Sequence, residues 1–219
     1  MRLDGAILDI DGTILDSMPV WHDCGARVLT RLGIEAEPGL GYILFAYTVS
    51  ESARYLIENY GLDMTEDEIR VLLNDEMKRF YQTEADFKPG ALHFLKELRR
   101  RNIPAVVVTS TDQEFIESAF QRLGISDWFA GILSSGTLGT SKGEPEIWKQ
   151  AAALLPGPAL YVFDDGLYAI RAAKDTGLGT IGIYDAISAG DEEEMRRISD
   201  MYLYSIGDYP FDELPQQGI

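Results

Sequence analysis

The chain of 219 residues is long enough for one large domain, or for a core domain with a smaller one, and needs no disulfides to bury a core. It carries 36 acidic and 19 basic residues, a formal net charge of −17, and such a field repels nucleic acids and anionic membrane surfaces. Its one cysteine excludes an internal disulfide, and no apolar stretch approaches the roughly 18 residues that cross a membrane. We therefore expect a cytoplasmic protein with no nucleic-acid or membrane partner.

The first predicted strand, residues 5–10, is a short apolar run that ends in acidic residues. Asp9 and Asp11 lie two positions apart at its end, and the glycine that follows permits a tight turn. A plain turn of aspartate and glycine is one interpretation of this pattern. A calcium loop is excluded, because an EF-hand needs glycine and glutamate where this chain has Ile14 and Val20.

Residues 17–86 contain no convincing buried strand and instead predict helices. Helical patterns lie near residues 17–32, 51–60 and 65–82. The third begins with Thr65-Glu-Asp-Glu68, which fits a capping box. This block would form a helical cap domain of residues 17–86, with a core domain made of residues 1–16 and 87–219. Ligands of open α/β sheets bind beyond the carboxyl ends of the strands, so we expect the cap to act as a lid there.

After this block, short apolar runs alternate with helical patterns. The predicted strands lie near residues 104–109, 131–134, 160–163, 180–184 and 201–206. The helical patterns lie near residues 90–101, 112–123, 143–155 and 166–175. Apolar runs this short suit strands buried on both faces, and their alternation with amphipathic helices indicates a parallel sheet covered by helices. The predicted fold is therefore α/β, with an open, mostly parallel, Rossmann-like sheet.

Hydroxyl residues follow the second predicted strand. Thr109 and Ser110 end this strand, and the next residues, Thr111 and Asp112, begin a helical pattern. A helix N-cap at Thr111 or Asp112 is the simplest interpretation. Hydroxyl and backbone N–H groups at the start of a helix also suit an anion, so a phosphate site is the alternative.

Charged residues follow two further strands. Lys142 comes shortly before a helical pattern, where a surface lysine is the ordinary interpretation. Asp164 and Asp165 directly follow a buried run, where their mutual repulsion requires a cation. Because the carboxyl ends of parallel strands meet at one edge of a sheet, four such junctions together indicate a single site.

Together these residues resemble the motifs of the haloacid dehalogenase-like (HAD) superfamily of phosphatases and phosphotransferases, and the resemblance extends over nearly the whole chain. The segments that carry it are Asp9-Ile-Asp-Gly-Thr-Ile-Leu-Asp-Ser17, Thr109, Lys142-Gly-Glu-Pro-Glu-Ile-Trp148 and Phe163-Asp-Asp-Gly166. The helical insert resembles the cap of the subgroup that contains phosphoglycolate phosphatases and β-phosphoglucomutases. The chain departs from the family pattern at Gly143, where proline is usual, and at Gly166, where a small polar residue is usual. We expect both glycines to loosen their loops without removing a reactive group.

The resemblance implies an enzyme, a Mg²⁺-dependent phosphoric monoester hydrolase that acts through an aspartyl-phosphate. It implies that Asp9 is the nucleophile and Asp11 the general acid and base. It implies that Mg²⁺ is held by Asp9, the backbone carbonyl of Asp11, Asp165 and Asp164. It implies that phosphate is held by Lys142, by the hydroxyl of Thr109, and by backbone N–H groups at Ile10, Asp11 and Ser110. The chemistry agrees, because a carboxylate attacks a phosphate dianion only when its charge is screened.

Other functions share parts of this pattern. In the mutases a basic cap residue holds a second phosphate, whereas residues 41–53 contain no lysine or arginine. This favours hydrolysis of a small phosphorylated metabolite over the alternative, a β-phosphoglucomutase-like sugar phosphate mutase. A dehalogenase normally lacks the second acid, and a response-regulator receiver has no place for the cap. A non-catalytic sensor of a phosphorylated ligand is the alternative from another class, although every reactive residue is present. The sequence indicates no obligate protein partner.

The helical block also contains conspicuous aromatic residues. Trp21, Tyr42, Phe45 and Tyr47 would either line a substrate pocket or pack in the core, and we expect core packing for most of them. We expect Cys24, in the first helix of the block, to be buried and unreactive.

Overall fold

The computed structural model describes residues 2–213, and the chain divides into two compact units. The first unit contains the residues up to Asp16 and those from Asp86 onward, and the second is the continuous segment Ser17–Ala85. Within residues 2–213, no helix combines the length and the apolar character that crossing a membrane requires.

The first unit is built on one sheet of six parallel strands in the order β3-β2-β1-β4-β5-β6. The strands are β1 (Gly5–Leu8), β2 (Ala105–Thr109), β3 (Ile132–Ser134), β4 (Leu160–Asp164), β5 (Gly179–Ile183) and β6 (Met201–Leu203). Leu8 lies opposite Val107 on one side and Phe163 on the other, so the carboxyl ends of three adjacent strands lie side by side. The residues that follow β1 therefore emerge at the centre of the sheet edge where α/β proteins bind ligands.

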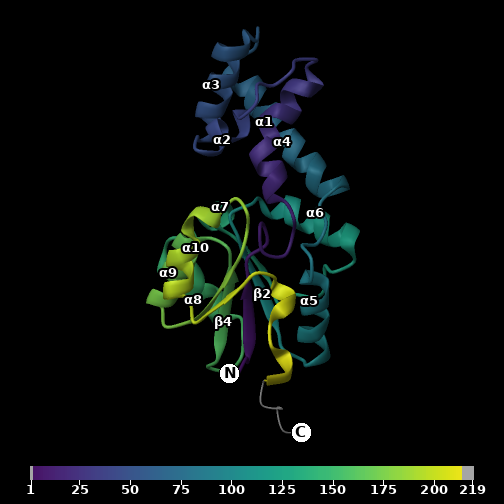
Figure 1. Ribbon diagram of the computed structural model, residues 1–219. Helices are drawn as coiled ribbons and strands as arrows, with labels where there is room; N and C mark the ends of the chain where they lie inside the picture. Colours follow the sequence, from purple (N-terminus) through teal and green to yellow (C-terminus); the bar gives the residue numbers. More distant parts are fainter. Residues whose placement is uncertain (1, 214–219) are drawn as a thin grey trace. The chain divides into compact units, whose positions relative to one another are not determined.

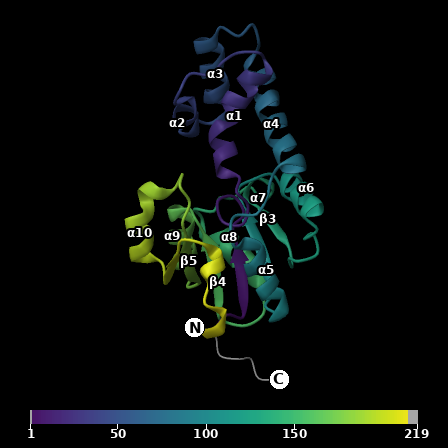
Figure 2. The same ribbon diagram turned by 45° about the vertical axis from the view of Figure 1, so that its right-hand side comes forward.

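Helices cover both faces of this sheet (Figures 1 and 2). They are α5 (Ala91–Arg100), α6 (Gln113–Leu123), α7 (Ser135–Leu138), α8 (Pro145–Ala153), α9 (Leu167–Asp175) and α10 (Glu192–Ile198). Val162 of β4 belongs to the core cluster that contains Trp148 of α8 and Ile170 of α9. The next residue, Phe163, instead contacts Phe94 of α5, with ring centroids 5.0 Å apart. This alternation buries β4 on both faces and explains its continuous apolar sequence.

The second unit consists of the helices α1 (Met18–Arg31), α2 (Leu40–Phe45), α3 (Val49–Tyr60) and α4 (Glu66–Thr83). The predicted capping box is present at α4, where Thr65 and Glu68 exchange hydrogen bonds. A second capping box, between Thr48 and Glu51, begins α3. The predicted fold class, an open parallel α/β core with an inserted helical cap, is confirmed. The short helix α2 was not predicted.

A buried glutamate organises the charges of the helical unit. The Glu76 side chain is fully buried, and its carboxylate forms ion pairs with Arg27 at 2.8 Å, Arg31 at 3.1 Å and Arg79 at 2.7 Å. Burial alone would raise the pKa of Glu76, but the hydrogen bonds from Arg79 and Arg31 hold it below its ordinary value of 4.5. Glu84, at the C-terminal end of α4, also forms ion pairs with Arg27 and Arg79. The cluster therefore joins α1 to the C-terminal half of α4.

The expectation that most of the conspicuous aromatic residues pack in the core is wrong. Tyr42, Phe45 and Tyr47 are 77%, 47% and 43% exposed. Trp21 is partly buried, and its Nε1 donates to the hydroxyl of Tyr81 at 2.9 Å. Cys24 is buried as expected, and burial raises the pKa of its thiol to about 12.

The loop between β1 and the helical unit pairs with the segment that returns to the core. Leu15 forms an antiparallel bridge with Phe87, and the Asp16 N–H donates to the Asp86 carbonyl at 2.9 Å. The two crossing points between the units are therefore neighbours within the first unit.

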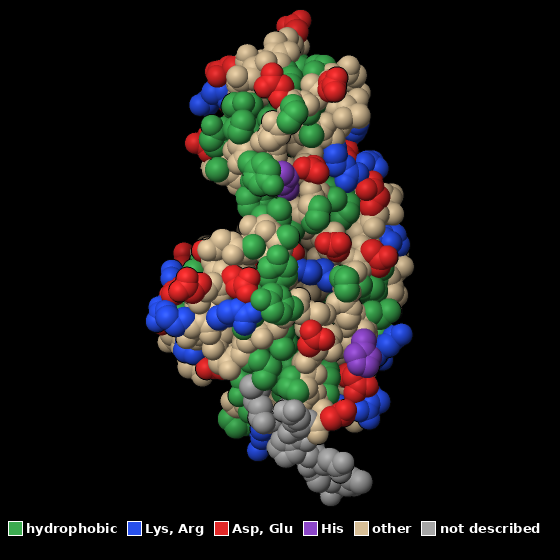
Figure 3. Space-filling view, viewed as in Figure 1, with side chains coloured by type: hydrophobic (Ala, Val, Ile, Leu, Met, Phe, Trp, Pro, Cys, Tyr) green, Lys and Arg blue, Asp and Glu red, His purple; other side chains and the backbone are tan. Residues whose placement is uncertain are grey.

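Acidic and basic side chains are interspersed over the visible surface instead of forming separate patches (Figure 3). The arginines of α10 illustrate this arrangement, because Arg196 pairs with Glu192 and Arg197 with Glu194. On this face the negative charge is therefore spread out and does not by itself mark a site.

Candidate active site

The chain turns sharply as it leaves β1. The carbonyl of Ile10 accepts hydrogen bonds from the N–H groups of Ile14 at 2.9 Å and Leu15 at 2.8 Å. Gly12 adopts a φ of 86°, in the left-handed region that glycine alone enters without strain. Asp9 stays in line with the strand, and its N–H donates to the Phe163 carbonyl of β4 at 2.9 Å. The turn thus fixes Asp9 at the end of the central strand.

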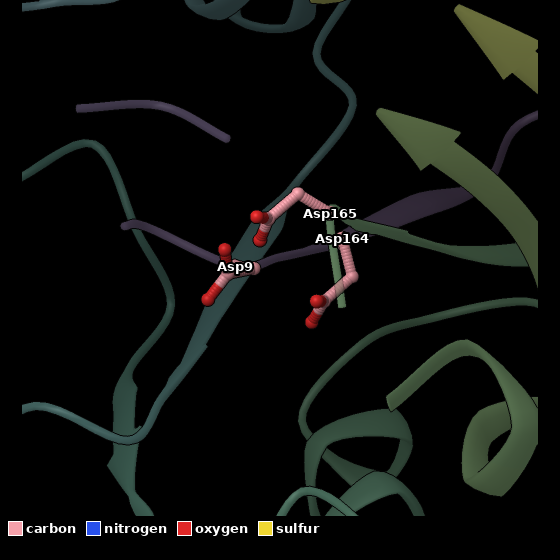
Figure 4. A group of neighbouring side chains, drawn as sticks. All are labelled: Asp9, Asp164 and Asp165. Carbon is pink, nitrogen blue, oxygen red and sulfur yellow. The ribbon is translucent and has the colours of Figure 1, made fainter. Parts of the chain in front are cut away.

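Three carboxylates meet at this point (Figure 4). Asp9, Asp164 and Asp165 are 2%, 0% and 6% exposed, and each offers an oxygen within 4.8 Å of the others. Asp164 is the last residue of β4 and Asp165 the next, so neighbouring parallel strands place the three acids together.

Lys142 lies among these acids and is itself 4% exposed. Its Nζ is 2.6 Å from Asp9 Oδ1 and 2.7 Å from Asp164 Oδ2. The Trp148 indole N–H donates to the Lys142 carbonyl at 2.9 Å, which fixes the loop before α8. Burial alone would lower the pKa of Lys142, but Asp164 and Asp9 hold it well above its ordinary value. The ordinary interpretation of Lys142 as a surface lysine is therefore wrong.

One lysine does not balance three buried carboxylates. Burial raises the pKa of Asp9 and Asp164, against the attraction of Lys142, and the charges of Asp164 and Asp165 add to the effect on Asp9. Burial and then the charge of Asp164 raise the pKa of Asp165 to about 7. Asp9 Oδ2 is buried without a hydrogen-bond partner. This donor set fits a divalent cation that prefers oxygen ligands.

The carboxylate of Asp11 lies outside this group of three. Its Oδ2 accepts a hydrogen bond of 2.7 Å from Thr111 Oγ1, at the end of the neighbouring strand β2. Asp112 occupies the N-cap position of α6, and the Thr111 hydroxyl bonds to Asp11 instead of capping the helix. The sequence offered a signal for this partner, since Thr111 is the third of three consecutive hydroxyl residues at the end of this strand.

The other predicted phosphate-binding residues of β2 lie at the same edge. Thr109 is fully buried, and its hydroxyl accepts the N–H of Thr111 at 3.0 Å. Ser110, the next residue, is exposed.

The carboxyl end of β5 contributes residues that sequence analysis missed. Ser188 Oγ donates to Asp165 Oδ2 at 2.8 Å. Nearby, Lys88 Nζ contacts Asp185 Oδ2 at 2.7 Å and the carbonyl oxygens of Gly12 at 2.5 Å and Tyr184 at 3.0 Å. Lys88 thus ties the turn after β1 to the loop that carries Ser188. The sequence did contain a signal for this loop, because Asp185 directly follows a predicted strand, as Asp164 does.

Comparisons with known proteins show what this chain is similar to. The family model described as haloacid dehalogenase-like hydrolase matches residues 3–177. A phosphoglycolate phosphatase of Rhodobacter capsulatus is 29% identical over 178 residues, covering 78% of this chain and 80% of that protein. A phosphorylated carbohydrates phosphatase of Thermotoga maritima is 22% identical over 192 residues, covering 86% of this chain and 88% of that protein.

The fold is also shared with solved structures. A protein of Thermotoga maritima assigned as a beta-phosphoglucomutase superposes with a TM-score of 0.80 at 20% identity, covering 94% of this chain and 96% of that chain. At this identity the likeness concerns the fold.

Proposed function

Because the chain belongs to the haloacid dehalogenase-like hydrolase family, we propose that it is a Mg²⁺-dependent phosphatase that hydrolyses a small phosphomonoester through an aspartyl-phosphate. The membership confirms the predicted family and the hydrolase class, and the relatives named as phosphatases support phosphoric monoesters as its substrates. The observation that carries the proposal is the buried contact of Lys142 with both Asp9 and Asp164, beside Asp165.

In this proposal the three buried acids and the backbone carbonyl of Asp11 hold Mg²⁺. When bound, Mg²⁺ screens the negative charges that would otherwise keep a phosphate dianion away from the carboxylate. Lys142 holds Asp9 Oδ1 in place and adds a positive charge beside the equatorial phosphate oxygens.

The proposed reaction has two steps. First, a carboxylate oxygen of Asp9 forms a bond to phosphorus, the ester P–O bond breaks, and Asp11 gives its proton to the departing oxygen. Second, Asp11 takes a proton from water, whose oxygen attacks the aspartyl-phosphate. Inorganic phosphate then leaves and the Asp9 carboxylate is restored. The hydrogen bond from Thr111 sets the orientation of Asp11 for both proton transfers.

The remaining phosphate contacts come from the loops after β1 and β2. The backbone N–H groups of Ile10 and Asp11 would donate to phosphate oxygens, and so would that of Ser110. The Thr109 hydroxyl uses a lone pair to accept from Thr111 and would donate its proton to phosphate.

We favour hydrolysis over phosphate transfer between sugar positions. Residues 41–53 of the helical unit expose tyrosine and phenylalanine side chains and contain no basic residue to hold a second phosphate. A reducing compartment suits the single buried thiol, and we propose the cytoplasm as the location of the enzyme.

Turnover of p-nitrophenyl phosphate by the purified protein tests this function. We expect Mg²⁺-dependent release of p-nitrophenol, which EDTA abolishes and added Mg²⁺ restores. Asp9→Asn should abolish turnover with an unchanged circular dichroism spectrum, and the exposed Asp175→Asn on α9 should leave it intact. Turnover by Asp9→Asn, or a wild-type protein that binds phosphate without turnover, would contradict the proposal. A panel of phosphorylated metabolites then identifies the substrate.

A further inference from the structure

Lys88 is a largely buried charged residue to which the proposed mechanism gives no task. Its side chain is only 15% exposed, and it directly follows Phe87, where the chain has just returned to the core unit. The Lys88 N–H donates to the Ile14 carbonyl at 2.9 Å, and Nζ donates to the Gly12 carbonyl at 2.5 Å. The backbone and the side-chain end of Lys88 are therefore both anchored to the turn that fixes Asp9.

Two further partners of the Lys88 ammonium group belong to the loop after β5. Nζ lies 3.0 Å from the Tyr184 carbonyl oxygen and 2.7 Å from Asp185 Oδ2. With the Gly12 carbonyl, these contacts give three acceptors to the three N–H donors of the group. The Asp185 side chain is only 7% exposed, and a buried carboxylate requires a partner of opposite charge. Lys88 thus joins the turn after β1 to the loop after β5.

The Asp185 carboxylate also sets the path of the loop that follows it. Residues 184–188 belong to no helix or strand, so their side-chain contacts matter for their conformation. While Asp185 Oδ2 contacts Lys88, Oδ1 accepts the Ile187 N–H at 2.9 Å. The next residue is Ser188, whose Oγ donates to Asp165 Oδ2 at 2.8 Å. An unbroken series of contacts therefore runs from the turn after β1 to one of the three clustered acids.

We propose that Lys88 is a positioning residue of the metal site, which holds the loop after β5 through Asp185 and so keeps Ser188 bonded to Asp165. This inference rests on the proposed function, in which Asp165 binds Mg²⁺. Lys88 itself touches neither the metal nor the substrate. Its loss should release the loop and leave the Asp165 carboxylate without its support, as Ser188→Ala does directly. Mg²⁺ binding should therefore weaken.

Isothermal titration of the metal-free protein with Mg²⁺ tests this role without any turnover. Loss of a support behind a metal ligand typically costs 10- to 100-fold in affinity, and we expect Lys88→Met to raise the Kd for Mg²⁺ roughly 10-fold. Loss of a positive charge would by itself favour the binding of a cation, so the charge effect has the opposite sign. A Kd for Mg²⁺ that rises therefore reports on positioning and not on charge.

Lys174→Met is the matched control, because it makes the same change of charge in a similar setting. Lys174 Nζ contacts the Ile198 carbonyl oxygen at 2.6 Å and Asp200 Oδ1 at 2.9 Å. Asp200 in turn accepts the N–H of Thr180, the second residue of β5. This arrangement lies at the amino end of β5, whereas Asp185 lies past its carboxyl end. The control should leave the Kd for Mg²⁺ within about twofold of wild type.

A second variant removes the unpaired charge that Lys88→Met leaves behind. Lys88→Met combined with Asp185→Asn buries no lone carboxylate and keeps the net charge, but it still breaks the link to the turn after β1. The Kd for Mg²⁺ should therefore rise in this variant as well. A wild-type Kd in the folded double variant would show that the link is not needed, and would overturn the inference.

A double-mutant cycle with Ser188→Ala tests the route of the effect. If Lys88 acts through Ser188, then Lys88→Met should change the Kd for Mg²⁺ by less than about twofold once Ser188→Ala is present. An equal effect in both backgrounds, or a Kd in Lys88→Met within twofold of wild type, overturns the inference and leaves the phosphatase function standing. A wild-type protein that neither binds Mg²⁺ nor turns over a phosphomonoester would instead refute the proposed function, and this inference with it.

Discussion

Thr111 Oγ1 donates to Asp11 Oδ2 at 2.7 Å and so links the carboxyl ends of β2 and β1. The bond fixes the Asp11 carboxylate, which does not belong to the group formed by Asp9, Asp164 and Asp165. In the proposed reaction, the side chain of Asp11 moves protons, and the carboxylates of the other three acids hold the metal.

Thr111→Val should therefore reduce turnover without weakening metal binding. The variant keeps the shape of the side chain but removes the donor, so the Asp11 carboxylate loses its orientation. General acid–base catalysis supplies a factor of about 10² to 10⁴, and we expect kcat to fall about 10-fold. Thr111→Ser restores the donor and should restore kcat. An unchanged kcat in Thr111→Val, measured with p-nitrophenyl phosphate, would remove the orienting role.

Ser188→Ala should weaken the binding of Mg²⁺. Ser188 holds Asp165 Oδ2 at 2.8 Å, and loss of a hydrogen bond behind a metal ligand typically costs 10- to 100-fold in affinity. Isothermal titration with Mg²⁺ measures the effect without any turnover. Ser118→Ala is the control, because that hydroxyl bonds only to the Phe115 carbonyl within α6. An equal Mg²⁺ affinity in both variants would show that Ser188 does not support the metal site.

Mg²⁺ should stabilise the folded protein, and Lys142 should determine how strongly. The three buried acids repel one another, and a bound cation relieves that repulsion in the folded state only. At a concentration of 100 times the Kd, binding contributes about 2.7 kcal/mol. Thermal unfolding should show a melting temperature that rises with Mg²⁺ in the wild type and rises further in Lys142→Met. A melting temperature independent of Mg²⁺ would exclude the proposed metal site.

Glu76→Gln should destabilise the protein through the helical unit. The substitution removes the charge that pairs with Arg27, Arg31 and Arg79. These arginines are partly exposed, so solvent screens the loss and we expect about 2 kcal/mol, less than for a fully buried pair. Urea unfolding at pH 7 measures the change. The matched control Arg70→Gln breaks an exposed pair with Asp67 and should cost less than about 0.5 kcal/mol.

The difference in the free energy of unfolding between the wild type and Glu76→Gln should depend on pH. The folded-state pKa of Glu76 lies below its ordinary value of 4.5, so its contribution is fully present above pH 4.5. The contribution is lost as the pH falls through the lowered pKa and Glu76 becomes protonated. The stability difference between wild type and Glu76→Gln should therefore shrink below about pH 4. A difference that is constant down to pH 3 would contradict this assignment.

The sequence predicted the strands and most helices because their patterns are local. The continuous apolar run of β4 and the capping box at Thr65 are examples, since each depends on neighbouring residues only. The short helix α2 was missed because six residues give too little periodicity. The exposure of Tyr42 was also missed, because whether an aromatic residue is covered depends on tertiary packing.

The sequence predicted that the charged residues meet at one edge of the sheet, but it did not predict how they are connected. Asp9, Lys142 and Asp165 could be predicted to lie together because the strands of a parallel sheet bring their carboxyl ends to one edge. That rule needs only the topology of the sheet. The partners Thr111 and Ser188 bond across strands from loops whose conformations the sequence pattern does not specify.

The bridge between Leu15 and Phe87 makes the helical unit equivalent to the loop of a hairpin. The chain leaves the core at Asp16 and returns at Asp86, and these two residues are already joined by a backbone hydrogen bond of 2.9 Å. The core therefore holds the two ends of the insertion together by its own backbone contacts, and a change in the length of the insertion should cost little loop-closure entropy. An insertion of different size or shape could occupy the same position without altering the register of the sheet. Through this junction, a change in the inserted unit should leave the strand ends that bear the reactive groups in place.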